Sequence, residues 1–267
     1  MKYLEIIESK DNSLIKETKK LKEKKYRLEK KEFLIEGFRF VDEALKSNFE
    51  VSKIFISEMI LDKWETYSIK NNIKSSTKVY VVNHNILKQL CSTENPQGIA
   101  AVVKNKDFKI ESKKGFYILV DKVQDPGNLG NIVRSSYASG ALGVILTKGT
   151  VDIYNEKVLR STMGSIFNIP IFQDDNFTKL KELKNNGFKL IVTSLKDSKN
   201  LYDEDLTQNI IIAVGNEGFG VSKEILELAD VKVKIPMPGG AESLNVAAAA
   251  SIIMFEAVRQ KLTIYKS

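Results

Sequence analysis

Polar side chains and glycines in the second half of the chain gather in loops that could bind a ligand. The first loop, residues 122–141, carries Asn128, Asn131 and Arg134 at the start of a predicted helix. A helix N-terminus offers free N–H donors and partial positive charge, and an arginine adds a planar fork that suits phosphate. These residues therefore predict a phosphate-binding loop, although an ordinary strand-to-helix turn also uses Gly and Asn.

Two later loops have a similar composition. In residues 215–225, three glycines within six residues allow close approach of a ligand to the backbone, and Glu217 can bind a ligand hydroxyl or a nearby arginine. In residues 237–258, Ser243 and Asn245 stand at the mouth of an alanine-rich helix. A plain turn around Glu217 and a simple helix cap at Ser243 are the structural alternatives.

Most metal and triad chemistries are excluded by composition. One cysteine, Cys91, and one histidine, His84, cannot form a Cys/His zinc cluster, and a histidine base would have to be His84. The glycines of GNLGNI do not have the dinucleotide-binding spacing G-x-G-x-x-G. The lone cysteine, the absence of a long apolar run and a start without secretory features lead us to expect a cytoplasmic protein without a membrane span.

The loops must be positioned by an α/β scaffold. Uniformly apolar strands separated by helical segments are typical of a parallel sheet covered by helices, whose ligands bind at the carboxyl ends of the strands. The expected strands of the second half are Tyr117–Asp121, Gly143–Thr147, Lys189–Thr193, Asn209–Gly215 and Val231–Pro236.

The first half predicts a smaller α/β unit. Strands are expected at Phe33–Glu36, Lys53–Ser57, Val79–Val82 and Gly98–Val103. Helices are expected at Phe38–Ser47 and His84–Leu90, and a helical stretch is expected to follow the second strand and to end at about Lys70. At about 150 residues per domain, 267 residues suggest two domains. We expect a first domain at 1–106, a polar linker at 107–115 and a second domain at 116–267.

Positive charge is concentrated in the first half. The net charge is +7, and residues 1–106 hold 21 Lys/Arg against 15 Asp/Glu, a net of +6. Residues 14–31 alone carry nine basic residues, and Leu14, Thr18, Leu21 and Leu28 recur at helical spacing, which predicts one amphipathic helix. Its lysines would bind the phosphates of a polyanion, with a merely solvated face as the alternative. The candidate phosphate-binding lysines are Lys19, Lys20, Lys24 and Lys25.

The three loops in this order, DPGNLGNIVR, GNEGFG and IPMPGGAESLNVAAA, resemble the signature of the SpoU, or TrmH-like, RNA 2′-O-ribose methyltransferases of the SPOUT superfamily. The resemblance covers Tyr117 to about Lys261. The first half resembles, through FLIEGFRFVDEAL, the ribosomal-protein-like RNA-binding domain that many members carry.

The resemblance implies a catalytic domain with a deep trefoil knot, a homodimer, and S-adenosylmethionine as cofactor without a metal. The last helix, Val246–Val258, would contribute to the dimer interface. By motif matching, the cofactor contacts would be Gly215, Ile235 and Leu244, with Thr193, Asn216 and Met237 close by.

The resemblance also assigns roles in catalysis. Arg134 would bind the target phosphate and stabilise the emerging alkoxide, because an arginine that is always protonated is a poor base. Glu217 would orient Arg134, Asn131 would contact RNA, and Asn128, Ser243 and Asn245 would position ribose and cofactor. His84 lies outside the motifs and is expected to be an ordinary residue.

The expected function is methyl transfer from S-adenosylmethionine to a ribose 2′-hydroxyl, with a guanosine of large-subunit ribosomal RNA as the expected target. A tRNA 2′-O-methyltransferase and a noncatalytic RNA-binding protein on the same fold are alternatives. A nucleotide-dependent oxidoreductase is a third, against which the missing G-x-G-x-x-G counts.

Overall fold

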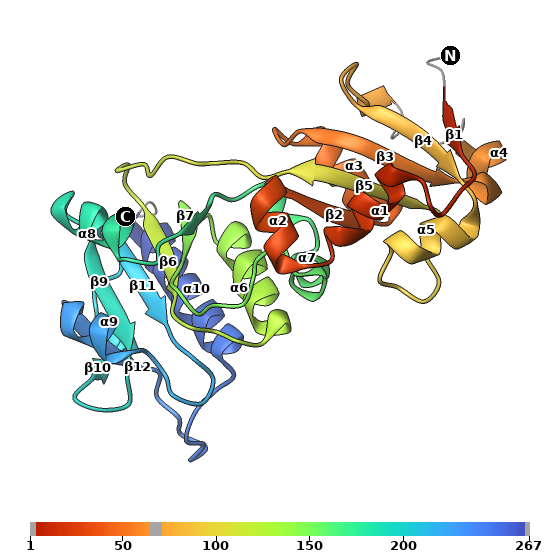
Figure 1. Cartoon of the computed structure of the whole chain (residues 1–267). Helices are drawn as coiled ribbons and strands as arrows, with labels where there is room; N and C mark the ends of the chain where they lie inside the picture. Colours follow the sequence, from red (N-terminus) through yellow and green to blue (C-terminus); the bar gives the residue numbers. More distant parts are fainter. Residues whose placement is uncertain (1–3, 65–70, 265–267) are drawn as a thin grey trace. The chain divides into compact units, whose positions relative to one another are not determined.

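Two β-sheets organise the chain, one in each of two units (Figure 1). The computed structural model describes residues 4–64 and 71–264. The first unit runs to Lys106 and includes Tyr154–Phe167; the second contains Asp107–Ile153 and the chain from Asn168. The sequence-based division did not anticipate that 154–167 packs with the first unit.

The first unit has a mixed sheet of five strands in the order β1-β4-β3-β5-β2. β5 is antiparallel to β2 and β3, whereas β4 is parallel to β1 and β3. The strands are β1 (Glu5–Ile7), β2 (Glu32–Glu36), β3 (Val51–Ser57), β4 (Lys78–Val82) and β5 (Ile99–Lys104). The four strands predicted from sequence are confirmed, and the short β1 was missed.

The helices of this unit agree with the sequence pattern except near the N-terminus. They are α1 (Ser13–Lys20), α2 (Lys24–Lys30), α3 (Phe38–Lys46), α4 (Leu61–Trp64), α5 (His84–Leu90) and α7 (Glu156–Thr162), with 3-10 turns at Glu58–Ile60 and Ser165–Phe167. Residues 65–70 of the helical stretch predicted to about Lys70 lie outside the described residues.

The prediction of one basic helix over residues 14–31 is wrong, because the chain breaks between α1 and α2. Leu21 ends α1 and is buried in the core of the unit. The buried Arg27 guanidinium donates hydrogen bonds to the carbonyl oxygens of Leu21 and Lys22, at 2.8 and 2.7 Å. These bonds satisfy carbonyls that a continuous helix would have satisfied itself.

The break also changes which side chains face the core. Leu28 is 61% exposed, although the helical pattern placed it with Leu14, Thr18 and Leu21 on the apolar face. All four candidate RNA-binding lysines of α1 and α2 are exposed. The basic residues therefore lie on two short helices instead of one long stripe.

The second unit has a parallel sheet of seven strands in the order β10-β12-β9-β11-β6-β7-β8. The strands are β6 (Phe116–Val120), β7 (Gly143–Leu146), β8 (Ile171–Gln173), β9 (Lys189–Thr193), β10 (Lys199–Asn200), β11 (Ile210–Val214) and β12 (Val231–Lys234). The predicted parallel sheet is confirmed. The short edge strands β8 and β10 were missed.

Helices cover both faces of this sheet. α6 (Pro126–Ala138) and α10 (Val246–Ile264) pack against each other on one face, and α10 contacts β11. α8 (Thr178–Asn185) and α9 (Lys223–Leu228) bury Leu180, Leu183 and Ile225 against the opposite face. Two-sided burial explains why the central strands are apolar at every position.

Segments without regular structure are anchored as well. Phe108 and Ile110 of the expected linker pack against the core of the second unit, and the Tyr117 hydroxyl donates to the Glu111 carbonyl at 2.8 Å. The expected linker is therefore tied to the second unit over this stretch.

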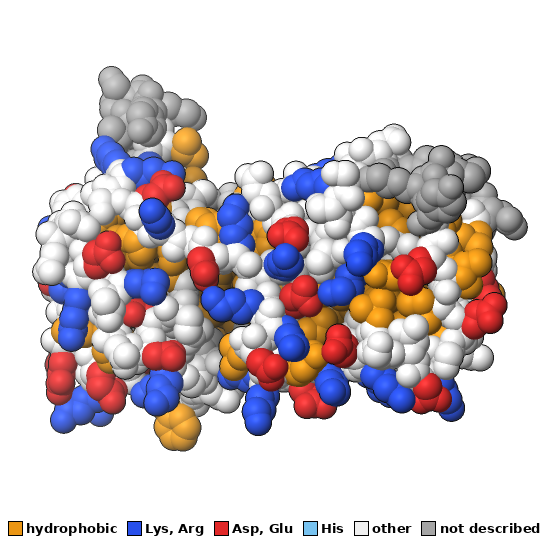
Figure 2. Space-filling view, turned by 45° about the horizontal axis from the view of Figure 1, so that its top comes forward, with side chains coloured by type: hydrophobic (Ala, Val, Ile, Leu, Met, Phe, Trp, Pro, Cys, Tyr) orange, Lys and Arg blue, Asp and Glu red, His pale blue; other side chains and the backbone are white. Residues whose placement is uncertain are grey.

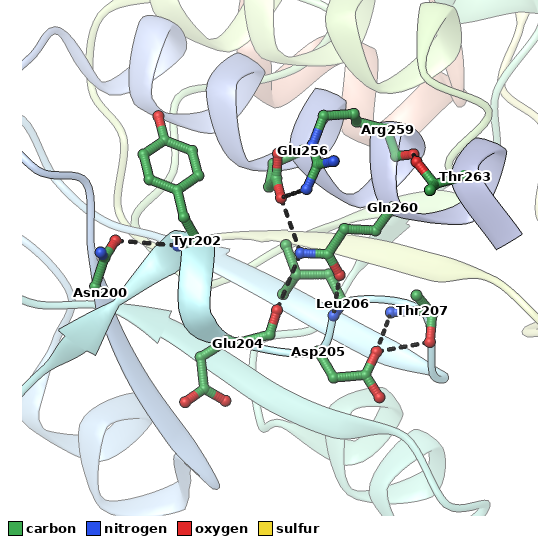
Figure 3. Close-up of polar contacts among 10 residues, drawn as sticks. All are labelled: Asn200, Tyr202, Glu204, Asp205, Leu206, Thr207, Glu256, Arg259, Gln260 and Thr263. Carbon is green, nitrogen blue, oxygen red and sulfur yellow. Dashed lines mark hydrogen bonds and ion pairs between the residues drawn. The ribbon is translucent and has the colours of Figure 1, made fainter.

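The last helix is held at its C-terminal end by one amide (Figure 3). The Gln260 side chain accepts from the Leu206 N–H at 2.8 Å and donates to the Glu204 carbonyl at 3.0 Å. It also donates to Glu256, whose buried carboxylate receives two hydrogen bonds of 2.7 Å from Arg259. The hydrogen bond from Arg259 is the main reason that the pKa of Glu256 lies below its ordinary value. α10 is thus fixed to the segment that leads into β11.

Candidate active site

The three loops of interest follow β6, β11 and β12 at the carboxyl edge of the parallel sheet, where their strands end together. Asp125 is the N-cap of α6, and its carboxylate accepts a hydrogen bond from the Asn128 N–H at 2.8 Å. Pro126 occupies the first position of the helix, where its missing N–H costs nothing. The sheet therefore brings Asn128 next to loops that lie about ninety residues or more away in sequence.

A chain of side-chain hydrogen bonds joins these loops. The Asn128 amide donates to Glu217 at 2.9 Å and accepts from the Asn245 amide at 2.9 Å. The Asn245 oxygen in turn accepts from the N–H groups of Ala247 and Ala248 at the start of α10. Asn128 is only 9% exposed, so its amide is the central element of the site. Asn245 caps α10, which makes the alternative assignment of Ser243 as the cap wrong.

Glu217 is held by backbone as well as by Asn128. Its two oxygens accept from the N–H groups of Gln124 at 3.2 Å and Asp125 at 3.1 Å. Partial burial raises the pKa of the Glu217 carboxyl, but the hydrogen bonds from Asn128 and the backbone outweigh this effect, so the pKa lies below its ordinary value. Glu217 is therefore ionised at neutral pH and is a weak proton acceptor.

The glycine loop is rigid and closely packed. Asn216 and Gly220 exchange two backbone hydrogen bonds of 2.8 Å, and the Asn216 side chain binds the Lys122 carbonyl at 2.9 Å. A Cβ atom on Gly215 would lie 2.2 Å from the backbone of Gly220 and Val221. Only glycine fits at position 215.

Arg134 and Asn131 lie on the exposed side of α6. In the part of the chain that the structure describes, Arg134 makes no hydrogen bond or ion pair. The expected pairing with Glu217 is thus not found within the chain. Helix geometry gives the reason: Glu217 binds the first turn of α6, whereas Arg134 lies six residues beyond Asn128, about 9 Å along the axis and about 120° around it.

The six predicted cofactor contacts come from the ends of three adjacent strands. Thr193 ends β9, Gly215 and Asn216 follow β11, and the other three, Ile235, Met237 and Leu244, follow β12. The Thr193 hydroxyl donates to the Ala213 carbonyl at 3.3 Å. Ile235 and Met237 are half-buried and Leu244 is exposed. Apolar side chains beside a close-packed glycine turn suit a ligand with an adenine ring, so these residues fit a nucleoside cofactor.

Asp121 is a supporting residue that the sequence reasoning missed. It is fully buried at the end of β6 and accepts hydrogen bonds from the Thr147 hydroxyl and the Ser222 N–H, both at 2.7 Å. It therefore fixes the loops that follow β7 and β11. An aspartate that directly follows an apolar strand was the available signal.

The remaining predicted residues take no part in the hydrogen bonds described above among the described residues. Ser243 is exposed. Lys19, Lys20, Lys24 and Lys25 belong to the first unit, where the Lys20 ammonium lies 5.6 Å from the centre of the Tyr26 ring. His84 begins α5 of the same unit, and Cys91 is a buried thiol whose pKa is raised by burial.

Residues 4–64 and 71–264 contain neither a grouped set of metal ligands nor a membrane-spanning helix. No three His, Cys, Asp or Glu side chains are grouped so that they could hold a metal ion. None of the helices in these ranges combines the length and apolar character needed to cross a membrane.

Comparison with known proteins supports one family for both halves. Residues 115–255 match the model of the SpoU rRNA Methylase family, and residues 12–101 match that of the MRM3-like substrate binding domain. The chain is 38% identical to the Bacillus subtilis 23S rRNA (guanosine(2553)-2′-O)-methyltransferase RlmP, across 93% of this chain and 97% of that protein.

Two solved structures are similar over nearly the whole chain. The AdoMet-bound rRNA methyltransferase from Sinorhizobium meliloti has a TM-score of 0.86 and 28% identity, covering 96% of this chain and 98% of that one. The SpoU methyltransferase AviRb from Streptomyces viridochromogenes, in complex with AdoMet, has a TM-score of 0.85 and 29% identity, covering 94% and 99%.

The hydrogen-bond chain predicts energetic coupling between Asn128 and Asn245. In a double-mutant cycle with Asn128→Ala and Asn245→Ala, the free energies of unfolding should be non-additive by about 0.5–3 kcal/mol, because either change removes the shared bond. Denaturant titration measures all four proteins. The control cycle pairs Asn245→Ala with Tyr137→Ala, at an exposed position near the end of α6, and should be additive. Additivity in the first cycle would contradict the bridge.

Proposed function

The chain belongs to the SpoU rRNA methylase family, and we propose that its target is a guanosine of large-subunit ribosomal RNA. Its activity is the transfer of a methyl group from S-adenosylmethionine to a ribose 2′-hydroxyl in RNA. The proposed target rests on the 38% identity, over almost the whole length of both chains, to a protein named for guanosine 2553 of 23S rRNA. A cytoplasmic location follows from this target.

We propose that Gly215, Ile235 and Leu244 contact S-adenosylmethionine, with Thr193, Asn216 and Met237 nearby. The bound cofactor supplies a methyl group that is already activated on a sulfonium, so no metal is needed. The close packing at Gly215 supports this assignment, because it fixes the loop that follows β11 at the carboxyl edge of the sheet. The adjacency of β9, β11 and β12 supports it further.

On the RNA side, we assign Arg134 to the target phosphate and to the negative charge that develops on the ribose oxygen. An exposed guanidinium without a partner among the described residues has its donors free for a phosphate. Asn131, one turn away on the same exposed side, would add a contact to the RNA.

Glu217, Asn128 and Asn245 are proposed as residues that position the site. The lowered pKa of Glu217 argues against a role as general base, because its carboxylate binds protons weakly. As a permanent acceptor it orients the Asn128 amide, which orients Asn245. Ser243, just before this cap, would contact ribose or cofactor.

The family fold implies a deep trefoil knot, and we propose one for the second unit. Residues 235–245 lead from β12, which β9 separates from β11, back to Asn128 at the start of α6. The helix that follows, α10, packs against α6 and contacts β11. That path supports a threaded C-terminal segment.

A homodimer is also proposed, with α10 in the interface. Phe255 is 48% exposed and Leu262 57% exposed on this otherwise well-packed helix. Ala248 and Ile252 continue toward the N-terminus of α10 at the same helical spacing, and neither is fully buried. An apolar stripe of this kind is typical of a surface that a second subunit covers.

The first domain, residues 1–106, is proposed to bind the RNA substrate, with 107–115 as linker and 116–267 as the methyltransferase domain. Support comes from the matched substrate-binding model and from the excess of positive charge in the first 106 residues. Acidic side chains are interspersed with the basic ones over the face drawn in Figure 2. Individual lysines, instead of one basic block, would therefore carry the attraction.

A direct test of the target uses the purified protein, S-adenosylmethionine with a labelled methyl group, and total bacterial RNA from a strain that lacks the enzyme. We expect label in 23S rRNA, released on nuclease digestion as 2′-O-methylguanosine. Label in tRNA would contradict the proposed target, and label on a base instead of ribose would contradict the reaction.

Arg134→Ala should lower methyl transfer at least about 100-fold and leave S-adenosylmethionine affinity unchanged, because Arg134 serves the RNA side. Arg134→Lys should restore little, since an ammonium cannot reproduce the planar fork. Single-turnover rates and calorimetry measure the two effects. Lys181→Ala, on the exposed surface of α8, is the control. A matching loss of cofactor affinity in Arg134→Ala would show that the assignment is wrong.

Replacing Lys19, Lys20, Lys24 and Lys25 by glutamine should weaken RNA binding and flatten its salt dependence. The log–log slope should fall by up to roughly 0.7–0.9 for each lost phosphate contact. RNA affinity is measured across a salt series. The matched control replaces four exposed lysines of the second unit: Lys113, Lys181, Lys189 and Lys199. An unchanged slope in the first variant would mean that α1 and α2 are only a solvated surface.

A further inference from the structure

A pocket of about 340 Å³ opens in the first unit, and none of its lining residues belongs to the loops of the candidate active site. It lies between α3, the segment 93–97 and the end of α7. Its volume is in the range of sites that hold small organic molecules. None of the functions assigned above uses it.

The pocket has an apolar side formed by Phe40, Leu159 and Met163. The Phe40 ring is held against Phe167, with 5.2 Å between the ring centres. Met163 ends α7 with a left-handed backbone (φ 50°), and its side chain is 49% exposed. A flat aromatic ligand could pack against these side chains.

Polar side chains also line the pocket, and several of them have no hydrogen-bonding partner among the described residues. Among the described residues, Glu43, Arg39 and Asn95 take part in no hydrogen bond or ion pair. Gln97 uses its oxygen to accept from the Phe38 N–H at 3.0 Å, which leaves its amide hydrogens available. The pocket therefore offers a carboxylate acceptor and several donors that the protein does not use itself.

The second carboxylate of the pocket is occupied. Glu36 accepts from the Ser92 N–H at 2.8 Å and from the Thr93 N–H at 3.4 Å, and it lies 3.6 Å from the Arg160 guanidinium. Glu36 thus holds the backbone of Ser92 and Thr93 in place, whereas the half-buried Glu43 is available to bind a ligand.

The charges of the pocket favour an uncharged polar ligand over a phosphate. Two glutamates balance two arginines among its lining residues. A carboxylate accepts two parallel hydrogen bonds from adjacent N–H groups, and an arginine donates to a pair of acceptors. Guanine has both: N1–H and N2–H₂ on one edge, O6 and N7 on the other.

We propose that this pocket binds an unpaired guanine base of the RNA substrate, with Glu43 on its N1–H and N2–H₂ edge and Arg39 on its acceptors. Unpaired bases are the elements of RNA that proteins read by stacking and by edge contacts. The pocket would then read a guanosine as a recognition element. This inference rests on the proposed function, because that function supplies the RNA.

Mononucleotides test the pocket without depending on methyl transfer. The full chain, with S-adenosylhomocysteine filling the cofactor site, is examined by saturation-transfer NMR with GMP, AMP, CMP and UMP. Saturation transfer should be strongest for GMP. It should disappear in Glu43→Gln, which at nearly unchanged size replaces one of the two acceptor oxygens by an NH₂ donor and so cannot accept from both N1–H and N2–H₂. It should persist in Glu58→Gln, an exposed glutamate outside the pocket. Equal signals for the four nucleotides, or an unchanged signal in Glu43→Gln, would overturn the proposal.

A second experiment measures the affinity of the protein for RNA. Glu43→Gln should raise the Kd for a 23S rRNA fragment about 5- to 150-fold, the roughly 1–3 kcal/mol of a bidentate base contact. Thr93→Trp, which fills the pocket from an exposed position, should do the same. Both variants should keep S-adenosylmethionine affinity and the rate at saturating RNA, as should Glu58→Gln.

The outcomes separate the two proposals. GMP binding with unchanged RNA affinity in both variants would overturn the assignment to RNA in favour of a free nucleotide. If the unaltered protein methylated no ribosomal RNA, the proposed target would fail, while the GMP experiment would still decide whether the pocket binds guanine.

Discussion

The active-site arrangement depends on one carboxamide. The side-chain NH₂ group of Asn128 donates to Glu217, and its oxygen accepts from Asn245. Three loops that are distant in sequence therefore share a single chain of hydrogen bonds. Because the amide is nearly buried, a loop that moved away would leave a polar group without a partner, which costs about 1–3 kcal/mol. The direction of the chain is set at one end by an ionised carboxylate, which can only accept, and at the other by backbone N–H groups of α10, which can only donate.

That chain works only on a rigid base, which the parallel sheet provides. β6, β9 and β11 are neighbours whose residues are apolar on both faces, so their carboxyl ends have little freedom. Asp121 fastens the end of β6 to the loops beyond β7 and β11. Gly215 then lets two backbone segments meet at a separation that any side chain would prevent. The loops are irregular, but their positions are determined by buried strands on one side and buried hydrogen bonds on the other.

The sequence predicted the sheet of the second unit well because burial on both faces leaves a plain signal, uninterrupted runs of Val, Ile and Leu. Short edge strands such as β8 and β10 bury few side chains and leave no such run. The basic helix was predicted as one piece because lysines and leucines have high helix propensity throughout residues 14–31. Its break depends on the buried Arg27, whose hydrogen bonds to two carbonyls are a tertiary effect that no local pattern reveals. Likewise, the family resemblance placed Glu217 and Arg134 in the same site, but only the structure shows that Glu217 meets the first turn of α6 instead.

The use of hydrogen-bonding capacity separates supporting residues from those available to a substrate. Some polar side chains form their hydrogen bonds within the protein and hold loops in place: Asn128, Asn245, Asp121 and Glu36. Arg134 in the second unit, and Glu43 and Arg39 in the first, have polar groups that no described residue engages, although each lies beside residues that are fully engaged. Leaving such groups open gains nothing for folding, and a half-buried carboxylate such as Glu43 loses part of its hydration without compensation. This contrast is the physical basis on which we propose that the partners of these open groups arrive with the RNA.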